Sequence, residues 1–210
     1  MHVLPAPAVP EIRLYTAHPA SGLWRLVGRD EDHSEPPYWA YRWAGGTVLA
    51  RHVLDHPETV RGRHVLDLGS GSGIVGIAAA KSGARSVLAA EIDPNGLVAL
   101  GLNAVENGVT LTPVGGDLTC GSPPGVDLIL VGDLFYAAEL AERVTAFLDR
   151  SLAMGIDVLV GDPGRAHLPH DQLRPIAQYL VPDFGSVRDA TTLSSVFAFE
   201  AARDAASIER

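Results

Sequence analysis

The chain has 210 residues, of which 47% are apolar and 20% charged, and its formal net charge is −9 at pH 7. This length fits one domain with a substantial core, and the acidic balance argues against a nucleic-acid partner, which calls for a basic face. The single cysteine excludes an intramolecular disulfide framework and a multi-cysteine metal site. No segment approaches the ~20 apolar residues of a membrane span, and the first residues lack the features of a signal peptide. We therefore expect a cytoplasmic protein that carries no metal and has no membrane partner.

The first part of the chain carries weak signals. Residues 1–10 are rich in proline and are expected to be frayed or extended. Polar and apolar residues alternate over 11–16, which predicts a short strand, and 23–27 is a second candidate. A polar, acidic loop follows over 30–37. We expect residues 1–36 to form an N-terminal extension or lid.

Four aromatic residues then stand within six positions, at Tyr38, Trp39, Tyr41 and Trp43. They form either a hydrophobic plug for the N-terminal segment or a cover over a ligand, since aromatic faces attract cations. A helix is predicted over 47–56, and Pro57 ends it.

The most informative stretch lies at the centre of the chain. Residues 64–68 are an apolar run typical of a buried parallel strand, and helical spacing resumes over 74–81. Between them stand Gly69, Gly71 and Gly73. Glycine tolerates positive φ and lets a ligand approach the backbone, and a helix start offers free N–H groups. The pattern predicts a strand, a ligand-binding turn and a helix.

Two ligands suit this turn. The string from Gly71 to Gly76 satisfies the dinucleotide pattern G-x-G-x-x-G. However, Asp67 directly precedes the glycines, and a carboxylate there repels a pyrophosphate and favours a ligand with a positive amino group. Asp-x-Gly-x-Gly-x-Gly resembles motif I of the class I methyltransferases, which bind S-adenosylmethionine (SAM).

The next strands end in polar residues. A strand over 86–90 leads to Glu91, and an acid at that place, about 20 residues past the glycines, holds ribose hydroxyls. Asp93 precedes Pro94 and is predicted to be the N-cap of a helix over 95–107. A strand over 111–114 leads to Asp117, which either binds an adenine amino group or forms a turn.

The apolar strand over 126–131 is expected to be central, and it leads to Asp133 and Tyr136. Ligands of open α/β sheets lie off the carboxyl ends of the strands. Asp133 is therefore a candidate acceptor for a target amine, and Tyr136 either orients that amine or packs in the core.

The remaining predicted elements are helices over 137–152 and 173–180 and strands over 156–160, 184–187 and 195–200. His167 and His170 near Asp171 are interpreted as solvated surface. The alternation of strands and helices predicts a parallel sheet with helices on both faces and an antiparallel C-terminal edge. This is the α/β, Rossmann-like, seven-stranded architecture of class I methyltransferases.

Several motifs together resemble the electron-transfer-flavoprotein β-subunit lysine methyltransferase family, from about Pro37 to Arg165 with a weaker tail to Glu200. They are Pro37-Tyr38-Trp39-Ala40, Trp43-Ala44-Gly45-Gly46, Val65-Leu66-Asp67-Leu68-Gly69-Ser70-Gly71, Asp93-Pro94, Gly132-Asp133-Leu134-Phe135-Tyr136 and Gly161-Asp162-Pro163-Gly164-Arg165. On this resemblance, 37–201 is the SAM-dependent methyltransferase domain and 202–210 a C-terminal tail.

The resemblance implies transfer of a methyl group from SAM to a protein lysine, with S-adenosyl-L-homocysteine as product and electron transfer flavoprotein β subunit as the leading substrate. Asp133 and Tyr136 would receive the lysine. Glu91 stands where Asp is more frequent. A small-molecule N- or C-methyltransferase and a non-catalytic SAM-binding module remain alternatives, and an NAD-dependent oxidoreductase is a more distant one. The implied cofactor-binding residues are Trp39, Trp43, Asp67, Gly69, Ser70, Gly71, Gly73, Glu91, Ile92, Asp117, Leu118 and Asp133.

Overall fold

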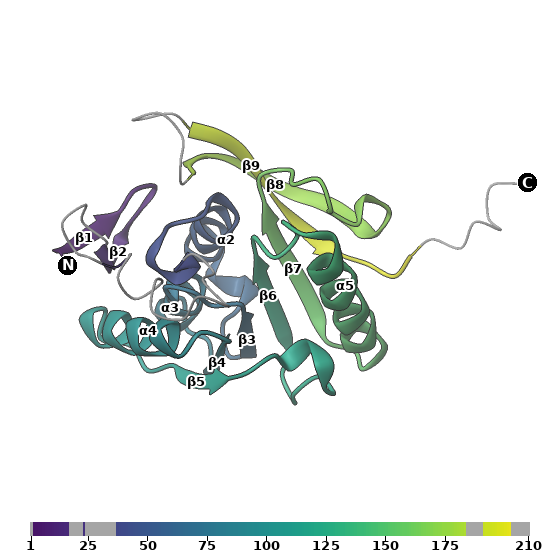
Figure 1. Cartoon of the computed structure of the whole chain (residues 1–210), viewed down its shortest axis with the longest axis horizontal. Coiled ribbons are helices and arrows are strands. Elements are labelled where there is room, and N and C mark those ends of the chain that lie inside the picture. Colours follow the sequence, from purple (N-terminus) through teal and green to yellow (C-terminus); the bar gives the residue numbers. More distant parts are fainter. Residues whose placement is uncertain (1, 17–22, 24–36, 184–190, 203–210) are drawn as a thin grey trace, which may run out of the picture.

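A seven-stranded sheet organises the protein (Figure 1). The computed structural model describes residues 2–16, 23, 37–183 and 191–202. The strand order is β5-β4-β3-β6-β7-β9-β8. The first five strands of this order are parallel, and β9 runs antiparallel to both β7 and β8. The predicted fold class is therefore confirmed. The strands are β3 (His64–Leu68), β4 (Ser86–Glu91), β5 (Thr112–Gly115), β6 (Leu128–Gly132), β7 (Asp157–Asp162), β8 (Leu173–Pro182) and β9 (Thr191–Phe199).

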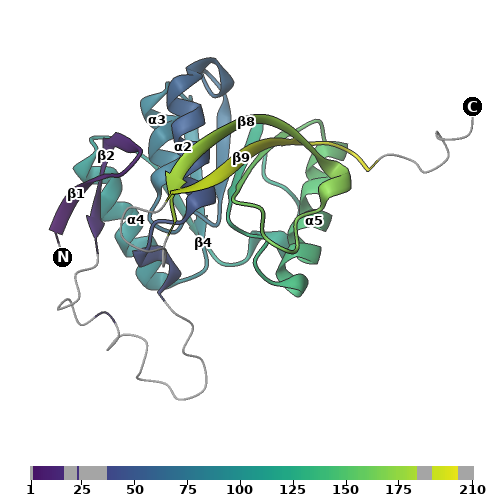
Figure 2. The ribbon, with the colours of Figure 1, turned by 90° about the horizontal axis from the view of Figure 1, so that it is seen from above.

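Helices cover both faces of the sheet, as Figure 2 shows. Successive side chains of a strand point to opposite faces. Val65 and Leu128 accordingly pack against α2 and α3, whereas Leu66 and Ile129 pack against α5. The strands are thus apolar on both faces, which explains their nearly continuous hydrophobic sequences. The helices are α2 (Ala44–Asp55), α3 (Ile74–Lys81), α4 (Pro94–Glu106) and α5 (Ala138–Ala153), with short 3-10 turns η1 (Tyr38–Ala40), η2 (Pro57–Thr59), η3 (Leu118–Cys120) and η4 (His170–Gln172).

The N-terminal segment forms a separate two-stranded hairpin. Its strands are β1 (His2–Ala6) and β2 (Val9–Thr16), which pair antiparallel around a turn at Ala8 with φ of 65°. The strand expected over 11–16 is confirmed as part of β2, whereas the pairing of residues 2–6 was not expected. Ile12 and Leu14 are buried in the same apolar cluster as α2 and α3. The strand expected over 23–27 lies outside the described residues, Leu23 excepted.

One predicted element is wrong. The helix expected over 173–180 is strand β8, which pairs with β9 along the edge of the sheet. Ile176 and Leu180, which would share one face of a helix, are both exposed. Ala177, Tyr179 and Val181 instead follow a period of two and pack against the apolar cluster under α2. Pro175 is tolerated because it lies at a bulge of an edge strand. The strand expected over 184–187 lies outside the described residues, and 195–199 belongs to β9.

Within the described ranges, no helix combines the length and the apolar character needed to cross a membrane.

Candidate active site

The glycine turn between β3 and α3 has the conformation that its sequence requires. Gly69, Gly71 and Gly73 have φ of 71°, 53° and 82°, a region that disfavours other residues. A Cβ on Gly69 would lie 2.7 Å from Leu134 Cδ2, and one on Gly73 would lie 2.4 Å from Leu100 Cδ1. The buried Ser70 lies within the turn, and its carbonyl accepts a 2.7 Å hydrogen bond from Gly73 N–H. The side chains of Leu134 and Leu100 therefore leave no room for a larger residue at Gly69 or Gly73.

Asp67 lies beneath this turn and is only 1% exposed. Its Oδ2 accepts a 2.9 Å hydrogen bond from Gly76 N–H in the first turn of α3. Burial raises the pKa of Asp67 to about 7, and the nearby Glu91 carboxylate adds to this shift. The carboxylate joins β3 to α3, a role that its place before the glycines did not suggest.

Glu91, at the end of β4, reaches back to the glycine turn. Its Oε2 accepts from Gly71 N–H at 2.8 Å and its Oε1 from Asp93 N–H at 2.9 Å. Asp93 caps α4 by accepting from Asn95 N–H at 2.8 Å, which confirms the predicted N-cap. Its second oxygen accepts from Trp39 Nε1 at 2.7 Å. This chain of contacts brings η1, β4 and the glycine turn together.

The expected adenine end of the site is more open. Ile92 is 65% exposed, and Leu118 is half-buried. Asp117 is exposed, and its Oδ1 accepts from Thr119 N–H at 2.9 Å. The turn-forming alternative for Asp117 therefore agrees with the structure, and its contact with a ligand stays a prediction.

The hairpin also reaches the glycine turn, through the buried Asn103 of α4. Asn103 Oδ1 accepts from Tyr15 N–H at 2.8 Å, and its amide donates to Ser72 O at 2.8 Å. Sequence reasoning missed this residue, because an asparagine inside a helical pattern carries no sign of the two loops that it joins.

Asp133, directly after β6, is the most constrained side chain of the site. It has φ of 59° and is 8% exposed. Its Oδ2 accepts from Gly46 N–H at 2.7 Å, and its Oδ1 accepts from Arg165 Nη2 at 2.7 Å. Burial raises its pKa to about 6, although Arg165 and the Gly46 N–H act in the opposite direction.

Helix α2 lies directly on the ends of β6 and β7. A Cβ on Gly45 would lie 2.2 Å from the Gly161 carbonyl oxygen, and one on Gly161 would lie 2.2 Å from the Gly45 carbonyl oxygen. A Cβ on Gly132 would lie 2.9 Å from Gly46 N. Only glycine permits this backbone approach. The motifs that contain these glycines indicate no role for them, because their spacing in the sequence does not reveal the contact.

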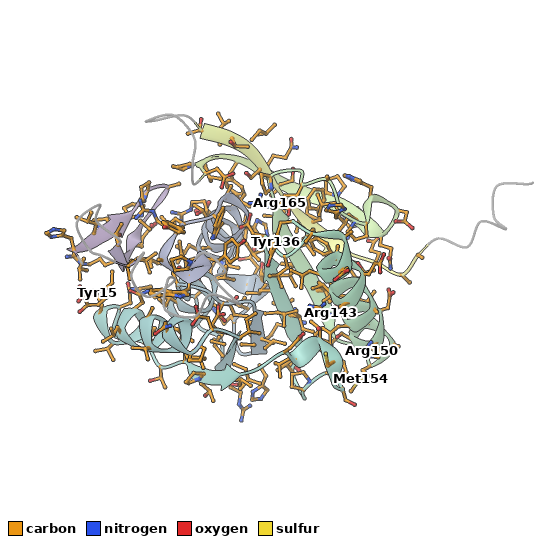
Figure 3. All side chains as sticks on the ribbon, in the orientation of Figure 1. Tyr15, Tyr136, Arg143, Arg150, Met154 and Arg165 are labelled. Carbon is orange, nitrogen blue, oxygen red and sulfur yellow. The ribbon has the colours of Figure 1, made fainter. Side chains whose placement is uncertain are left out.

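Aromatic side chains form the exposed rim beside Asp133. The ring of Tyr136 is 5.7 Å from that of Tyr38, and the ring of Trp43 is 5.9 Å from Tyr38. Tyr136 is 47% exposed, so the core-packing alternative is wrong for it, and the buried aromatic residue of this segment is its neighbour Phe135. Figure 3 shows Tyr136 and Arg165 in the same region of the molecule.

His167 and His170 are exposed, as expected. Among the residues that the structure describes, no three His, Cys, Asp or Glu side chains are grouped so that they could hold a metal ion.

Comparisons with known proteins agree on one class of enzyme. The family model of ribosomal protein L11 methyltransferase (PrmA) matches residues 45–123. The solved structure of a ribosomal protein L11 methylase from Lactobacillus delbrueckii subsp. bulgaricus is 24% identical, with a TM-score of 0.52 over 74% of this chain and 78% of that one. TrmN from Thermus thermophilus is 23% identical, with a TM-score of 0.52 over 72% and 48%. These structures share the fold with this chain.

Two relatives are closer in sequence. The electron transfer flavoprotein beta subunit lysine methyltransferase of Xenopus laevis is 41% identical over 92% of this chain and 81% of its own length. The protein of the same name from Rattus norvegicus is 40% identical over 83% and 70%. Both alignments thus extend over most of this chain and of the relative, and the chain belongs to the electron transfer flavoprotein beta subunit lysine methyltransferase family.

Proposed function

We propose that this protein transfers a methyl group from SAM to a lysine amine of the electron transfer flavoprotein β subunit. Family membership supports the reaction and the substrate. The structural observation that carries the proposal is the Asp133 carboxylate, which lies at the carboxyl end of a central strand under an aromatic rim that contains Tyr136. Ligands of open α/β sheets bind at this edge.

The residues at the glycine turn fit SAM. At Gly71 a Cβ would meet only Trp39 Cα, at 3.7 Å, so the backbone there is accessible to a ligand. Each carboxylate oxygen of Glu91 already accepts one N–H and retains a lone pair for a ribose hydroxyl. Ile92 and Leu118 offer apolar surface for a flat base. Asp67 supports the glycine turn from the β3 side. Trp39 in η1 and Trp43 at the start of α2 lie on the side of the site proposed to hold SAM.

When bound, SAM supplies a methyl group on a positively charged sulfur. The residues of the chain then prepare the acceptor. A lysine ammonium has a reference pKa near ~10.4 and must lose a proton before its nitrogen can attack. Asp133 accepts a hydrogen bond from the amine and fixes its direction, and the aromatic rim excludes water and surrounds the lysine stem. Tyr136, which is exposed beside Asp133, orients the amine from the other side.

We infer that the protein does not bind nucleic acid, since its net charge is −9. We also propose that it works in the cytoplasm. No observation favours a small-molecule acceptor, which becomes an outcome of the test below.

The test is methylation of purified electron transfer flavoprotein, and in parallel of a cell extract, with methyl-labelled SAM, followed by mass mapping of the labelled lysine. We expect label in the β subunit. Asp133→Asn should lower turnover by ~100-fold, because a misplaced amine costs about that much, and Tyr136→Phe should lower it as well. Both variants should keep SAM affinity, because the Asp133 carboxylate contacts Gly46 and Arg165 rather than the glycine turn proposed to hold SAM. Asp171→Asn, an exposed aspartate on η4, is the matched control and should behave as the unmodified protein.

Three outcomes would contradict the proposal. Label found only in small molecules of a cell extract would favour the small-molecule alternative. SAM binding without any transfer would favour a non-catalytic module. Full turnover of both site variants would show that Asp133 and Tyr136 do not form the acceptor site.

A further inference from the structure

Arg165 makes the closest charged contact to the proposed acceptor site. Its Nη2 lies 2.7 Å and its Nε 3.3 Å from Oδ1 of Asp133. The two side chains are 22% and 10% exposed, so this ion pair is largely shielded from water. Shielded charges interact more strongly than surface charges.

The loop after β7 determines where Arg165 lies. Oδ1 of the fully buried Asp162 accepts hydrogen bonds from Gly164 N–H and Arg165 N–H, both at 2.7 Å. The Arg165 guanidinium carbon lies 5.7 Å from the centre of the Trp43 ring, within the range of a cation–π contact. The guanidinium is thus held between the carboxylate and the aromatic rim.

Asp133 is held from a second direction. Its other oxygen accepts the Gly46 N–H in the first turn of α2, and its backbone adopts a positive φ that is unfavourable for a residue with a side chain. The charged groups around the pair are Arg165 and Asp162 from the β7 end and its loop, Asp183 after β8, and the positive end of the α2 dipole. Tyr136 lies on the following segment and is exposed.

We propose that Arg165 is a positioning residue that keeps Asp133 ionised and aimed at the lysine amine while it balances the charge of that carboxylate. This inference rests on the proposed function. A lone carboxylate stabilises the ammonium form of a neighbouring amine and would oppose its deprotonation. A carboxylate paired with a guanidinium keeps a directional acceptor atom but has little net charge, so it orients the neutral amine without stabilising the proton on it.

The electrostatics of the site agree with this geometry. Burial raises the pKa of Asp133 to about 6 even though Arg165 lowers it. Without the guanidinium, only the Gly46 N–H would oppose the effects of burial and of Asp162, so the pKa of Asp133 would rise further and more of the carboxyl group would hold a proton at neutral pH. A protonated carboxyl group donates a hydrogen bond to the amine nitrogen and blocks the lone pair that must attack.

The test compares Arg165→Gln and Arg165→Lys with the unmodified protein from pH 6.5 to 9.5. Dividing each kcat/KM by that of the unmodified protein removes the ionisation of the lysine substrate. For Arg165→Gln we expect a loss of at least ~10-fold at pH 7 that shrinks as pH rises, because the ionised fraction of Asp133 grows ~tenfold per pH unit below its pKa. Arg165→Lys keeps the charge, and its ratio should not change with pH. SAM affinity should be unchanged in both.

A pH-independent ratio for Arg165→Gln would overturn the inference, since a merely structural role lowers activity equally at every pH. Arg174→Gln, which removes an exposed arginine paired with Glu200, is the matched control.

A second measurement needs no variant. The carboxyl ¹³C signal of Asp133 in the unmodified protein should titrate below pH 7, and titration above pH 7.5 would also overturn the inference. If the unmodified protein transfers no methyl group to lysine, the proposed function itself fails. If the unmodified protein does transfer it but the kcat/KM ratio of Arg165→Gln does not change with pH, only the role of Arg165 is rejected.

Discussion

At the scale of single residues, two buried carboxylates each accept a hydrogen bond from the start of a helix but have different charged neighbours. Asp67 accepts Gly76 N–H at 2.9 Å and Asp133 accepts Gly46 N–H at 2.7 Å, each at the start of a helix. Burial raises the pKa of both, to about 7 and about 6. Asp133 has Arg165 as a counterion, whereas Asp67 faces the like charge of Glu91. This difference suits Asp133 to remain ionised beside a substrate.

Asp67→Asn should change how stability depends on pH. The pKa of Asp67 is about 7 in the folded protein and near 3.8 in a model peptide, so the folded state binds the proton more tightly. Folding stability therefore falls as pH rises from about 4 to about 7, by about 1 kcal/mol per pH unit, because the unfolded chain releases this proton while the folded protein keeps it. The free energy of unfolding of Asp67→Asn minus that of the unmodified protein should rise between pH 5 and pH 7 and level off above. Urea unfolding without SAM measures it.

The pH dependence, rather than the offset, is the informative quantity here, because an asparagine amide also changes the hydrogen bonds of the site. Asp171→Asn on the surface should show a constant difference over the same range. A constant difference for Asp67→Asn too would mean that Asp67 ionises in the folded protein as it does in a peptide.

At the scale of elements, the seating of α2 on the sheet decides the geometry of the proposed acceptor site. Gly45 and Gly161 approach each other backbone to backbone, and this approach brings Gly46 N–H to the Asp133 carboxylate. Asp183 Oδ1 also accepts from Ala44 N–H, at 3.1 Å. Trp43, the N-cap residue, provides no side-chain cap. Carboxylates from distant elements thus accept hydrogen bonds from two of the first N–H groups of this helix.

Gly45→Ala and Gly101→Ala make the same chemical change in two helices and should have opposite effects. The new Cβ at Gly45 would lie 2.2 Å from a backbone oxygen, so α2 must move. We expect a loss of at least about 2 kcal/mol of stability and a large loss of methyl transfer. At Gly101 in α4 a Cβ meets nothing within 4 Å, and alanine should stabilise the helix by up to about 1 kcal/mol.

Chemical unfolding and turnover of both variants provide the comparison. If Gly45→Ala kept full stability and activity, close backbone contact between α2 and β7 would not be required for the acceptor site.

At the scale of the whole molecule, the N-terminal hairpin and the sheet domain share one core. Ile12 and Leu14 are no more than 2% exposed, and they belong to the apolar cluster that also contains residues of α2, α3 and the sheet. Arg13 and Glu106 add an ion pair between the hairpin and α4. A domain boundary at residue 37 remains a proposal about sequence organisation; these contacts indicate that the hairpin contributes to the stability of the domain that follows it.

Ile12→Ala should therefore destabilise the entire protein, by about 2–5 kcal/mol. Leu4→Ala, on the neighbouring strand, removes a side chain that is 49% exposed and should cost well under half as much. Thermal unfolding followed by a signal from the sheet domain reports the effect. An Ile12→Ala protein with an unchanged midpoint would show that the hairpin is energetically independent of the rest.

The sequence by itself determined the central unit of this protein. The apolar run, the three glycines and the helical spacing of residues 64–81 are local features, and the strand, turn and helix follow at those positions. Local patterns also placed Asp133 at the end of a central strand and Asp93 at the N-cap of α4. These features depend on backbone preferences and hydrophobic periodicity within a few residues.

Only the tertiary structure decided the rest. The apolar residues within 173–180 fit the period of a helix as well as that of a strand. Pairing with β9 and packing under α2 made the segment a strand. The contacts of Asp133 with Arg165 and Gly46 join positions 32 and 87 residues apart. Sequence periodicity carries no information about such distant pairs, because the pairs form only when the β7 loop and the start of α2 are brought to the same end of the sheet.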